Sequence, residues 1–416
     1  MDYQEALKKV KKLLKNAELG DVKFDETQNR LVFRGDHPTI GFYNEENVRL
    51  FIKTVDVLWK ADNEIFETYT LETFEKSFIR FLAKAKQDEI CSDDTLKAFY
   101  RDLRSVEAKT FEILYVVFGA KYYKGHPLTI GPFTLYNPSI HRKHLLDKYP
   151  HSELMLSMAF DPDENDEEAK KIEVVVGVSE RARESLRASQ KAYVHLQQFE
   201  NTMRFILGRE DTEECDIGVF NFNEIKRTRG VLLSDTHATV TSRMKGAFDP
   251  ILLHKYPIND SQYGHDKLWE MLAKEKLTDL EKRIISAVSW VGKGLRDEEP
   301  ARAFVQYVFA LEALLQIQQD VLVSPSITYS ISEMSAFILG HDLKMRLEIE
   351  KVAKEVYGKR SAIAHGSSQE VDSLLLKDAL WLIKSLITVL ITDERFQDFK
   401  QIGDIQNWIK TTKYSF

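Results

Sequence analysis

The sequence has little cysteine and no long apolar run, and each absence narrows the class of protein. Its two cysteines, Cys91 and Cys215, lie far apart in the chain, and neither belongs to a Cys-x2-Cys pair. This spacing argues against a disulfide framework and against a cysteine zinc site. No run approaches the ~18 apolar residues that span a bilayer, and residues 1–15 form an amphipathic stretch without the apolar core of a signal peptide. We therefore expect a cytoplasmic protein with no membrane partner.

Positive charge is also in deficit, because 58 Lys and Arg residues face 65 Asp and Glu residues, for a formal net charge of −7. A chain of this balance has no general affinity for polyanions, so any contact with nucleic acid must be local. Hydrophobic residues make up 43% of the chain and charged residues 30%, as in ordinary globular proteins. The length of 416 residues allows two or three domains.

Residues 1–265 are predicted to form an α+β region with a sensing or regulatory role, with a division near residue 120. The apolar spacing predicts helices at 2–19, 45–60, 71–90, 94–118 and 179–208. Alternating or Gly- and Pro-punctuated segments predict a hairpin of 22–24 with 30–34, and strands at 128–136, 154–160, 172–177, 217–222 and 230–233. Residues 255–264 have the composition of a linker.

Residues 270–395 are predicted to form an all-α helical bundle, followed by a helical tail at 396–416. Thr278-x-x-Glu281 matches a capping box, and Pro300 stands where a helix is expected to start. A Ser-rich loop is expected at 320–330. Further helices are expected at 331–339, 342–357 and 370–391.

The stretch Tyr357–Gly366 places an arginine, a small hydroxyl and a histidine between two glycines, directly after the predicted helix 342–357. Gly358 is expected to loosen the helix and Gly366 to cap it. Arg360 and His365 are five residues apart, so on a regular helix they would lie roughly 140° around the axis from each other. Two copies of the stretch that meet across a twofold axis would build a better site than one copy.

Arg360-Ser361-x3-His365-Gly366 after Val356-Tyr357, with Ala310-Leu-Glu-Ala-Leu-Leu315 on an earlier helix, resembles the signature of the HEPN superfamily in its Apea-like branch. The resemblance covers roughly residues 277–395. It implies a helical bundle that dimerises and cleaves RNA without a metal or other cofactor. His365 would then move a proton during attack of a 2′-hydroxyl, and Arg360 would stabilise the charged phosphate. Ser361 would orient the histidine or the phosphate, and Glu312 would support Arg360.

The resemblance further implies an endoribonuclease of a bacterial antiviral or toxin-type system, acting on single-stranded or loop RNA. The N-terminal region would then respond to a phage-derived or nucleotide trigger. Family members that are modified as toxins carry a tyrosine two residues after the histidine, whereas this chain has Ser367. The alternative is a non-catalytic module for dimerisation or nucleotide binding. The acidic balance of residues 277–395, with 14 Lys or Arg against 17 Asp or Glu, favours this alternative.

Three other patterns are candidate sites. A basic segment places Lys226, Arg227, Arg229, Arg243 and Lys245 beside aromatic residues, which is typical either of RNA contact or of a strand edge protected by charge.

His141-x2-His144, with His126 and His151 nearby, has no carboxylate at matching helical spacing other than Asp147, so we predict no metal there. Asp161-x-Asp163-x-Asn165 begins like a calcium loop, but Asp166 replaces the required glycine and Ile172 the required glutamate.

Overall fold

A computed structural model describes residues 2–20, 30–161, 172–208, 216–222, 226–236, 238–246, 249–316, 327–364 and 370–415. The chain divides into two compact units, one of residues 1–113 with 179–193 and the other of residues 114–178 with 194–416. Elements of mixed α+β character come first along the chain and a run of helices comes last, as expected. The predicted domain boundaries at 265–270 and 395 lie inside the second unit and stay predictions.

The first unit is built mainly of helices around an aromatic core. Its helices are α1 (Tyr3–Asn16), α2 (Glu45–Lys60), α3 (Asn63–Thr68), α4 (Leu71–Gln87) and α5 (Asp93–Ser105). The antiparallel strands β1 (Ala17–Leu19), β3 (Ile40–Tyr43) and β2 (Arg30–Phe33) form a small sheet in that order. Phe74 and Phe78 of α4 are fully buried against Phe99 of α5, at ring distances of 5.8 Å each. The aromatic stripe of residues 71–90 is therefore core.

The helix expected at 94–118 is wrong beyond residue 105, because α5 ends at Ser105 and β4 (Lys109–Val116) follows as a strand. The apolar residues of β4 fit both a helical and an alternating period, and its backbone is paired in a sheet. The arm of the hairpin predicted at 22–24 lies outside the described residues.

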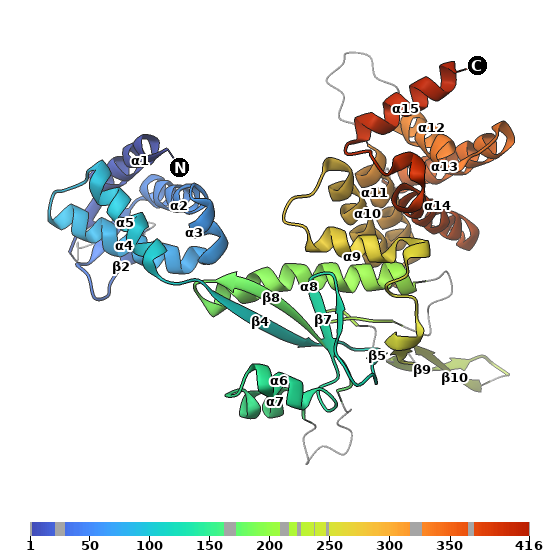
Figure 1. The fold of residues 1–416 in the computed structure, drawn as a ribbon, viewed down its shortest axis with the longest axis horizontal. Coiled ribbons are helices and arrows are strands. Elements are labelled where there is room, and N and C mark those ends of the chain that lie inside the picture. Colours follow the sequence, from blue (N-terminus) through green and yellow to red (C-terminus); the bar gives the residue numbers. More distant parts are fainter. Residues whose placement is uncertain are drawn as a thin grey trace. The chain divides into compact units, whose positions relative to one another are not determined.

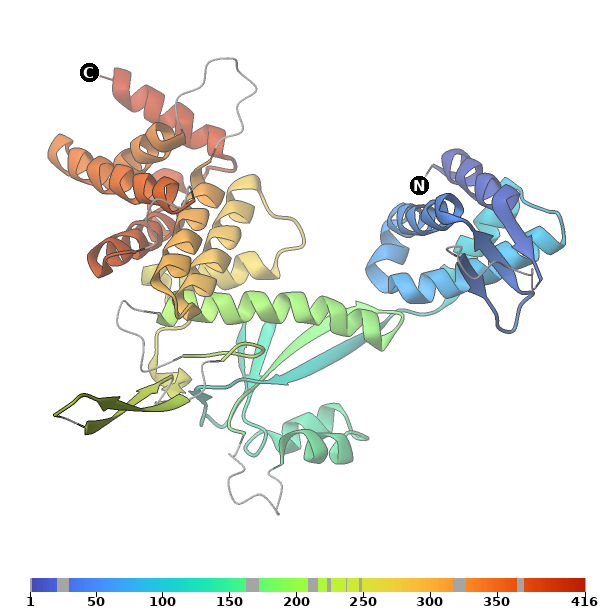
Figure 2. The same ribbon diagram turned by 180° about the vertical axis from the view of Figure 1, so that it is seen from behind.

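The middle of the chain forms a four-stranded sheet in the order β4, β8 (Val175–Ala182), β7 (Phe133–Tyr136) and β6 (Leu128–Ile130). Phe133 of β7, Phe199 of α8 (Ser185–Leu207) and Trp269 of α9 (His265–Ala273) pack against one another, with ring centroids 5.2 to 6.0 Å apart. The C-terminal part of α8 therefore lies between the sheet and the helices that follow, as both ribbon views show (Figures 1 and 2).

The strand predicted at 154–160 is wrong, because these residues form α7 (Glu153–Phe160), which follows α6 (Arg142–Lys148). Leu156 and Phe160 are buried, whereas Leu154, Met155 and Met158 are exposed. Two buried residues four positions apart fit the period of a helix. The apolar residues also alternate, as in a strand, but over a segment too short to distinguish a strand from a helix. The segment predicted as a strand at 217–222 makes only an isolated bridge, between Phe118 and Gly218.

The antiparallel strands β9 (Lys226–Leu233) and β10 (Ala238–Lys245) form a two-stranded hairpin (Figure 1). The short strands β5 (Ala120–Lys121) and β11 (Ile251–Leu252) pair in parallel, and the single turns η2 (Leu253–Lys255) and η3 (Ser261–Tyr263) follow. The predicted linker 255–264 is anchored, because the indole of Trp269 donates to the Ile258 carbonyl at 2.7 Å and His265 Nδ1 contacts the Pro257 carbonyl at 2.7 Å.

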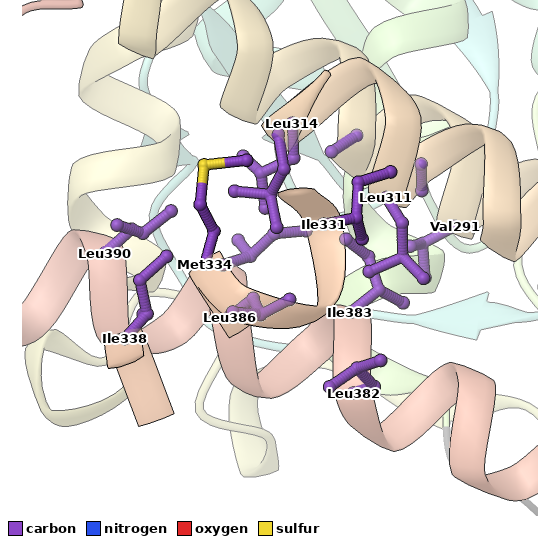
Figure 3. Packing of buried hydrophobic residues seen from close by; sticks show 14 of the residues in the cluster. Val291, Leu311, Leu314, Ile331, Met334, Ile338, Leu382, Ile383, Leu386 and Leu390 are labelled. Carbon is purple, nitrogen blue, oxygen red and sulfur yellow. The ribbon is translucent and has the colours of Figure 1, made fainter. Parts of the chain in front are cut away.

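The rest of the chain is helical. Its elements are α10 (Asp279–Arg296), α11 (Pro300–Leu315), α12 (Ile327–Leu339), α13 (Leu343–Ala364), α14 (Ser373–Thr392), η4 (Glu394–Phe396) and α15 (Ile402–Tyr414). The capping box of Thr278 with Glu281 is present, and Pro300 is the first residue of α11. Figure 3 shows part of the core of these helices, where Met334 of α12 lies among apolar side chains of α11, α12 and α14. The apolar period of the sequence thus predicted this bundle correctly.

The predicted tail at 396–416 is part of the same core. Ile402, Ile405 and Ile409 of α15 are buried within the bundle cluster, and the Leu280 amide donates to the Lys400 carbonyl at 2.9 Å. In the part of the chain that the structure describes, no helix has both the length and the apolar character that a bilayer crossing requires.

Candidate functional site

Arg360 lies on a helix that continues past residue 357, where the sequence predicted its end. Helix α13 continues from Leu343 through Gly358 to Ala364, so Arg360 is in its last two turns. A glycine costs about 1 kcal/mol in a helix but does not end one when the neighbouring turns are packed. Val356 and Tyr357, which precede it, are buried in the bundle core and hold the helix together across this position.

A carboxylate on the neighbouring helix holds Arg360. Oε1 of Glu312 on α11 forms an ion pair with Arg360 Nη2 at 3.4 Å. The same oxygen accepts a hydrogen bond from the Tyr357 hydroxyl at 2.8 Å. The side chain of Glu312 is 16% exposed and that of Arg360 is 32% exposed. Burial and the hydrogen bond to Glu312 raise the pKa of Tyr357 to about 12, so its hydroxyl stays a donor at neutral pH. Arg360 is therefore anchored at one end and open to solvent at the other.

An aromatic row continues from Arg360 along the surface of α11 and α10. The Phe309 ring lies 6.0 Å from the Arg360 guanidinium carbon, and the Trp290 ring meets Phe309 edge-on at 5.2 Å. Lys293 places its ammonium 4.4 Å from the Trp290 ring centroid. Cations over ring faces gain roughly 0.5–1 kcal/mol at exposed sites. Sequence reasoning missed this row, although Trp290 and Lys293 are three residues apart on one predicted helix face.

His365 and Ser361 are the other two residues predicted to contact the substrate with Arg360. His365 lies outside the described residues. Ser361 belongs to the backbone of α13, and its side chain lies outside the described part of the structure. The structure therefore brings Arg360 and Glu312 together, and the roles of His365 and Ser361 stay predictions.

The predicted basic RNA contact lies on the β9–β10 hairpin. Backbone pairing joins Lys226 to Lys245, Arg243 to Thr228 and Arg229 to Ser242. All five basic residues, including Arg227, thus fall in the half of the hairpin away from its turn. Their side chains are outside the described part of the structure, so RNA contact there stays a prediction.

The histidine cluster of residues 126–151 contains a buried structural histidine. His141 Nδ1 accepts from the Asn137 amide at 2.9 Å, so Nε2 carries the proton and donates to the Lys124 carbonyl at 2.9 Å. Burial lowers the pKa of His141, which favours the neutral ring that these two contacts require. Both ring nitrogens are therefore occupied by backbone groups. Among the residues that the structure describes, no group of three or more His, Cys, Asp or Glu side chains comes together as a metal site.

The remaining acidic segment, predicted to be a failed calcium loop, falls mostly on residues 162–171, outside the described part of the chain. No family model, curated protein or solved structure matches this chain.

Proposed function

We propose that this protein is a dimeric, metal-independent endoribonuclease that cleaves single-stranded or loop RNA at Arg360 and His365. The observation that carries the proposal is the state of Arg360. Its guanidinium is fixed by Glu312 and yet about one third exposed, as a group must be that receives a phosphate from solution. A planar guanidinium binds two phosphate oxygens at once, which a fixed orientation favours.

The proposed reaction is a transesterification. His365 removes the proton of a ribose 2′-hydroxyl, whose oxygen attacks the adjacent phosphorus, while Arg360 stabilises the charge that builds on the phosphate oxygens. The bond to the 5′-oxygen then breaks, and that oxygen takes a proton from an imidazolium. The products are a 2′,3′-cyclic phosphate and a 5′-hydroxyl. No water or metal-activated hydroxide takes part in this cleavage step.

A composite site from two copies supports this chemistry better than a single copy. On a regular helix positions 360 and 365 would lie roughly 140° apart, so one copy of the motif would present them in different directions. Helix α14, which follows in the chain, exposes Leu374 by 63% and Trp381 by 44%. These residues are seven apart and so share one helix face. An exposed apolar face next in sequence to the motif supports a twofold contact through the bundle.

A second candidate is a non-catalytic interaction module, and the Glu312 contacts favour it. One carboxylate balances the Arg360 charge and accepts from Tyr357. An arginine held in this way can serve the packing of α11 on α13 alone. In that case Arg360 and His365 stabilise the bundle or its dimer and no RNA is cut.

The test compares the full-length protein with Arg360→Lys and His365→Ala in mixed RNA with excess chelator. Loss of His365 removes general acid–base assistance worth about 10²–10⁴ in rate. Lysine at 360 keeps the charge but loses the two-pronged contact, so cleavage also falls. Lys351→Ala, an exposed lysine on the same helix, is the matched control and keeps full cleavage.

The chemical structure of the product ends and the response to 2′-deoxy substrates also test the proposed reaction. We expect 2′,3′-cyclic phosphate ends, and no cleavage where a 2′-deoxy nucleotide stands at the cut. Cleavage that needs a divalent metal, or that survives in His365→Ala, overturns the assignment. If no RNA is cut and both substitutions lower the melting temperature or dissociate the dimer, the interaction module is the correct function.

A further inference from the structure

A polar cleft of about 530 Å³ lies within the second unit, between α8 and the facing parts of α10 and α11. Its volume is within the range of pockets that hold small molecules, roughly 300–1,000 Å³. Four cationic side chains and three carboxylates line it, together with Trp290 and Phe222. It is separate from the groups assigned to RNA cleavage, because Arg360 is not among its lining residues.

The floor of the cleft is a buried ion network that holds its shape. Arg204 of α8 is 4% exposed, donates to Glu200 at 2.7 Å and to Asp216 at 3.0 Å, and also donates to the Asn221 carbonyl. Glu200 is 2% exposed and accepts from the Asn221 amide at 3.1 Å. Because one arginine holds two carboxylates, these groups form a preformed base and are not the groups that attract a phosphate.

Close helix packing fixes the walls. A Cβ added to Gly292 of α10 would lie 2.3 Å from the backbone oxygen of Asn201 on α8, so only glycine permits this approach. The residue after it in the chain is Lys293, which lines the cleft. The contact of α10 with α8 therefore sets where Lys293 and Trp290 stand relative to the floor.

Cations at the rim are accessible. Lys293 is exposed and lies over the Trp290 ring, which holds its ammonium beside the cleft. The side chain of Arg302 on α11 is 64% exposed and is oriented by Asp297 at 3.1 Å, which also accepts from Gln306 at 2.8 Å. Arg302 Nε pairs with this carboxylate and also with Glu299 Oε2 at 3.0 Å, which together orient the guanidinium. Lysine and arginine in such positions bind phosphate oxygens.

We propose that this cleft binds a nucleotide unit, with the phosphate at Lys293 and Arg302 and the base against Trp290 and Phe222. The rings supply flat apolar surfaces on which every heteroaromatic base can stack, at roughly 1–3 kcal/mol per base. Phosphate alone would use only the rim, and an apolar ligand would leave the rim cations without an anionic ligand and would desolvate them. A base joined to a phosphate satisfies both halves of the cleft.

The source of the nucleotide unit is either a free nucleotide or one residue of an RNA strand, and the experiment has an arm for each. Trp290 also packs edge-on against Phe309, whose ring faces Arg360. A ligand on Trp290 would therefore be connected through Phe309 to the proposed catalytic arginine. The binding itself does not depend on RNA cleavage, so failure of the proposed activity leaves this proposal standing.

The experiment is calorimetric titration of the full-length protein with ATP, GTP, AMP, adenosine, ribose 5-phosphate and a six-nucleotide single-stranded RNA. The variants are Lys293→Glu and Arg302→Glu. The matched control is Lys282→Glu, an exposed lysine on α10 that does not line the cleft. Far-UV circular dichroism and melting temperature verify that each variant is folded.

We expect saturable binding of at least one nucleotide or of the RNA. Each rim substitution should weaken it tenfold or more, because a charged contact is worth about 1.5–3 kcal/mol and 1.4 kcal/mol is tenfold. Lys282→Glu should change affinity less than twofold. Adenosine and ribose 5-phosphate should both bind more weakly than AMP.

Binding of the free nucleotides identifies a small-molecule site, whereas binding of the RNA alone identifies a strand-binding site. The proposal is overturned if nothing binds at millimolar concentration. It is also overturned if ribose 5-phosphate equals AMP, or if folded Lys293→Glu and Arg302→Glu bind as the unaltered protein does.

Discussion

Glu312 and Arg360 lie 48 positions apart in the chain and form an ion pair of 3.4 Å between α11 and α13. The same carboxylate oxygen accepts from Tyr357, so one group connects a charged side chain to a buried hydroxyl. Glu312 is thus the residue on which both candidate functions of the bundle depend, and its contacts can be measured without any assay of activity.

A double-mutant cycle tests this network. Glu312→Ala should lower the free energy of unfolding by about 1–3 kcal/mol, because it leaves the Tyr357 hydroxyl without an acceptor. Tyr357→Phe should lower it by about 0.5–1.5 kcal/mol. Urea unfolding at pH 7 should show that the double variant loses less than the sum of the two single losses. Additivity within about 0.3–0.5 kcal/mol would mean that the contact contributes nothing.

Stability should fall in mild acid because of His141. Burial lowers its pKa, and the hydrogen bond to the Lys124 carbonyl only partly opposes this. The unfolded chain, with a histidine pKa near 6.5, then binds a proton at a pH where the folded chain does not. The stability that neutral His141 contributes is fully present above pH about 6.5. It is lost as the pH falls through the pKa of His141 in the folded protein.

The measurement is urea unfolding at intervals from pH 7.5 to pH 5. His141→Gln should reduce the slope of stability against pH by up to about 1.4 kcal/mol per pH unit, the value for one proton. His265, whose pKa burial also lowers, should keep part of the slope. The control is His151→Gln, the same substitution at an exposed histidine. An unaltered slope in His141→Gln would contradict the assignment.

Two glycine substitutions should act in opposite directions. Gly358→Ala should raise the free energy of unfolding by about 0.5–1 kcal/mol, because alanine is the better helix former and its Cβ would meet nothing within 4 Å. Gly292→Ala should lower it by about 1–3 kcal/mol, because its Cβ would press on Asn201. Thermal unfolding of both variants checks the pair. Destabilisation by Gly358→Ala would show that α13 does not pass through this position as a regular helix.

The proposed dimer should depend on the exposed face of α14. Trp381→Glu should raise the dimer dissociation constant about tenfold or more, because central aromatic anchors contribute 2 kcal/mol or more to interfaces. Analytical ultracentrifugation over a range of concentrations measures the change. Met158→Glu, which alters an apolar residue of α7 exposed by 74%, is the control. A protein that is monomeric, or a dimer that Trp381→Glu leaves intact, would remove this support for a composite site.

The sequence alone determined most of the helices. It also determined that elements of mixed α+β character precede the run of helices along the chain. Apolar residues at helical spacing, the Thr278–Glu281 box and Pro300 act within a few residues of chain, so they can be recognised without knowing the fold. The motif at Arg360 and His365 was also found from sequence, through its resemblance to a family. Arg360 was expected after a helix end, but it lies within α13.

Only the tertiary structure decided the elements whose local signals were ambiguous. Residues 109–116 became a strand because a sheet offered their backbone partners, and residues 153–160 became a helix because Leu156 and Phe160 bury together. Gly358 stayed helical because packing of α13 outweighs the intrinsic preference of a single glycine. The row from Arg360 to Lys293 joins residues of α10, α11 and α13, and the cleft beside it joins residues of α8, α10 and α11. Such sites depend on long-range contacts, whose free energy no local window of sequence contains.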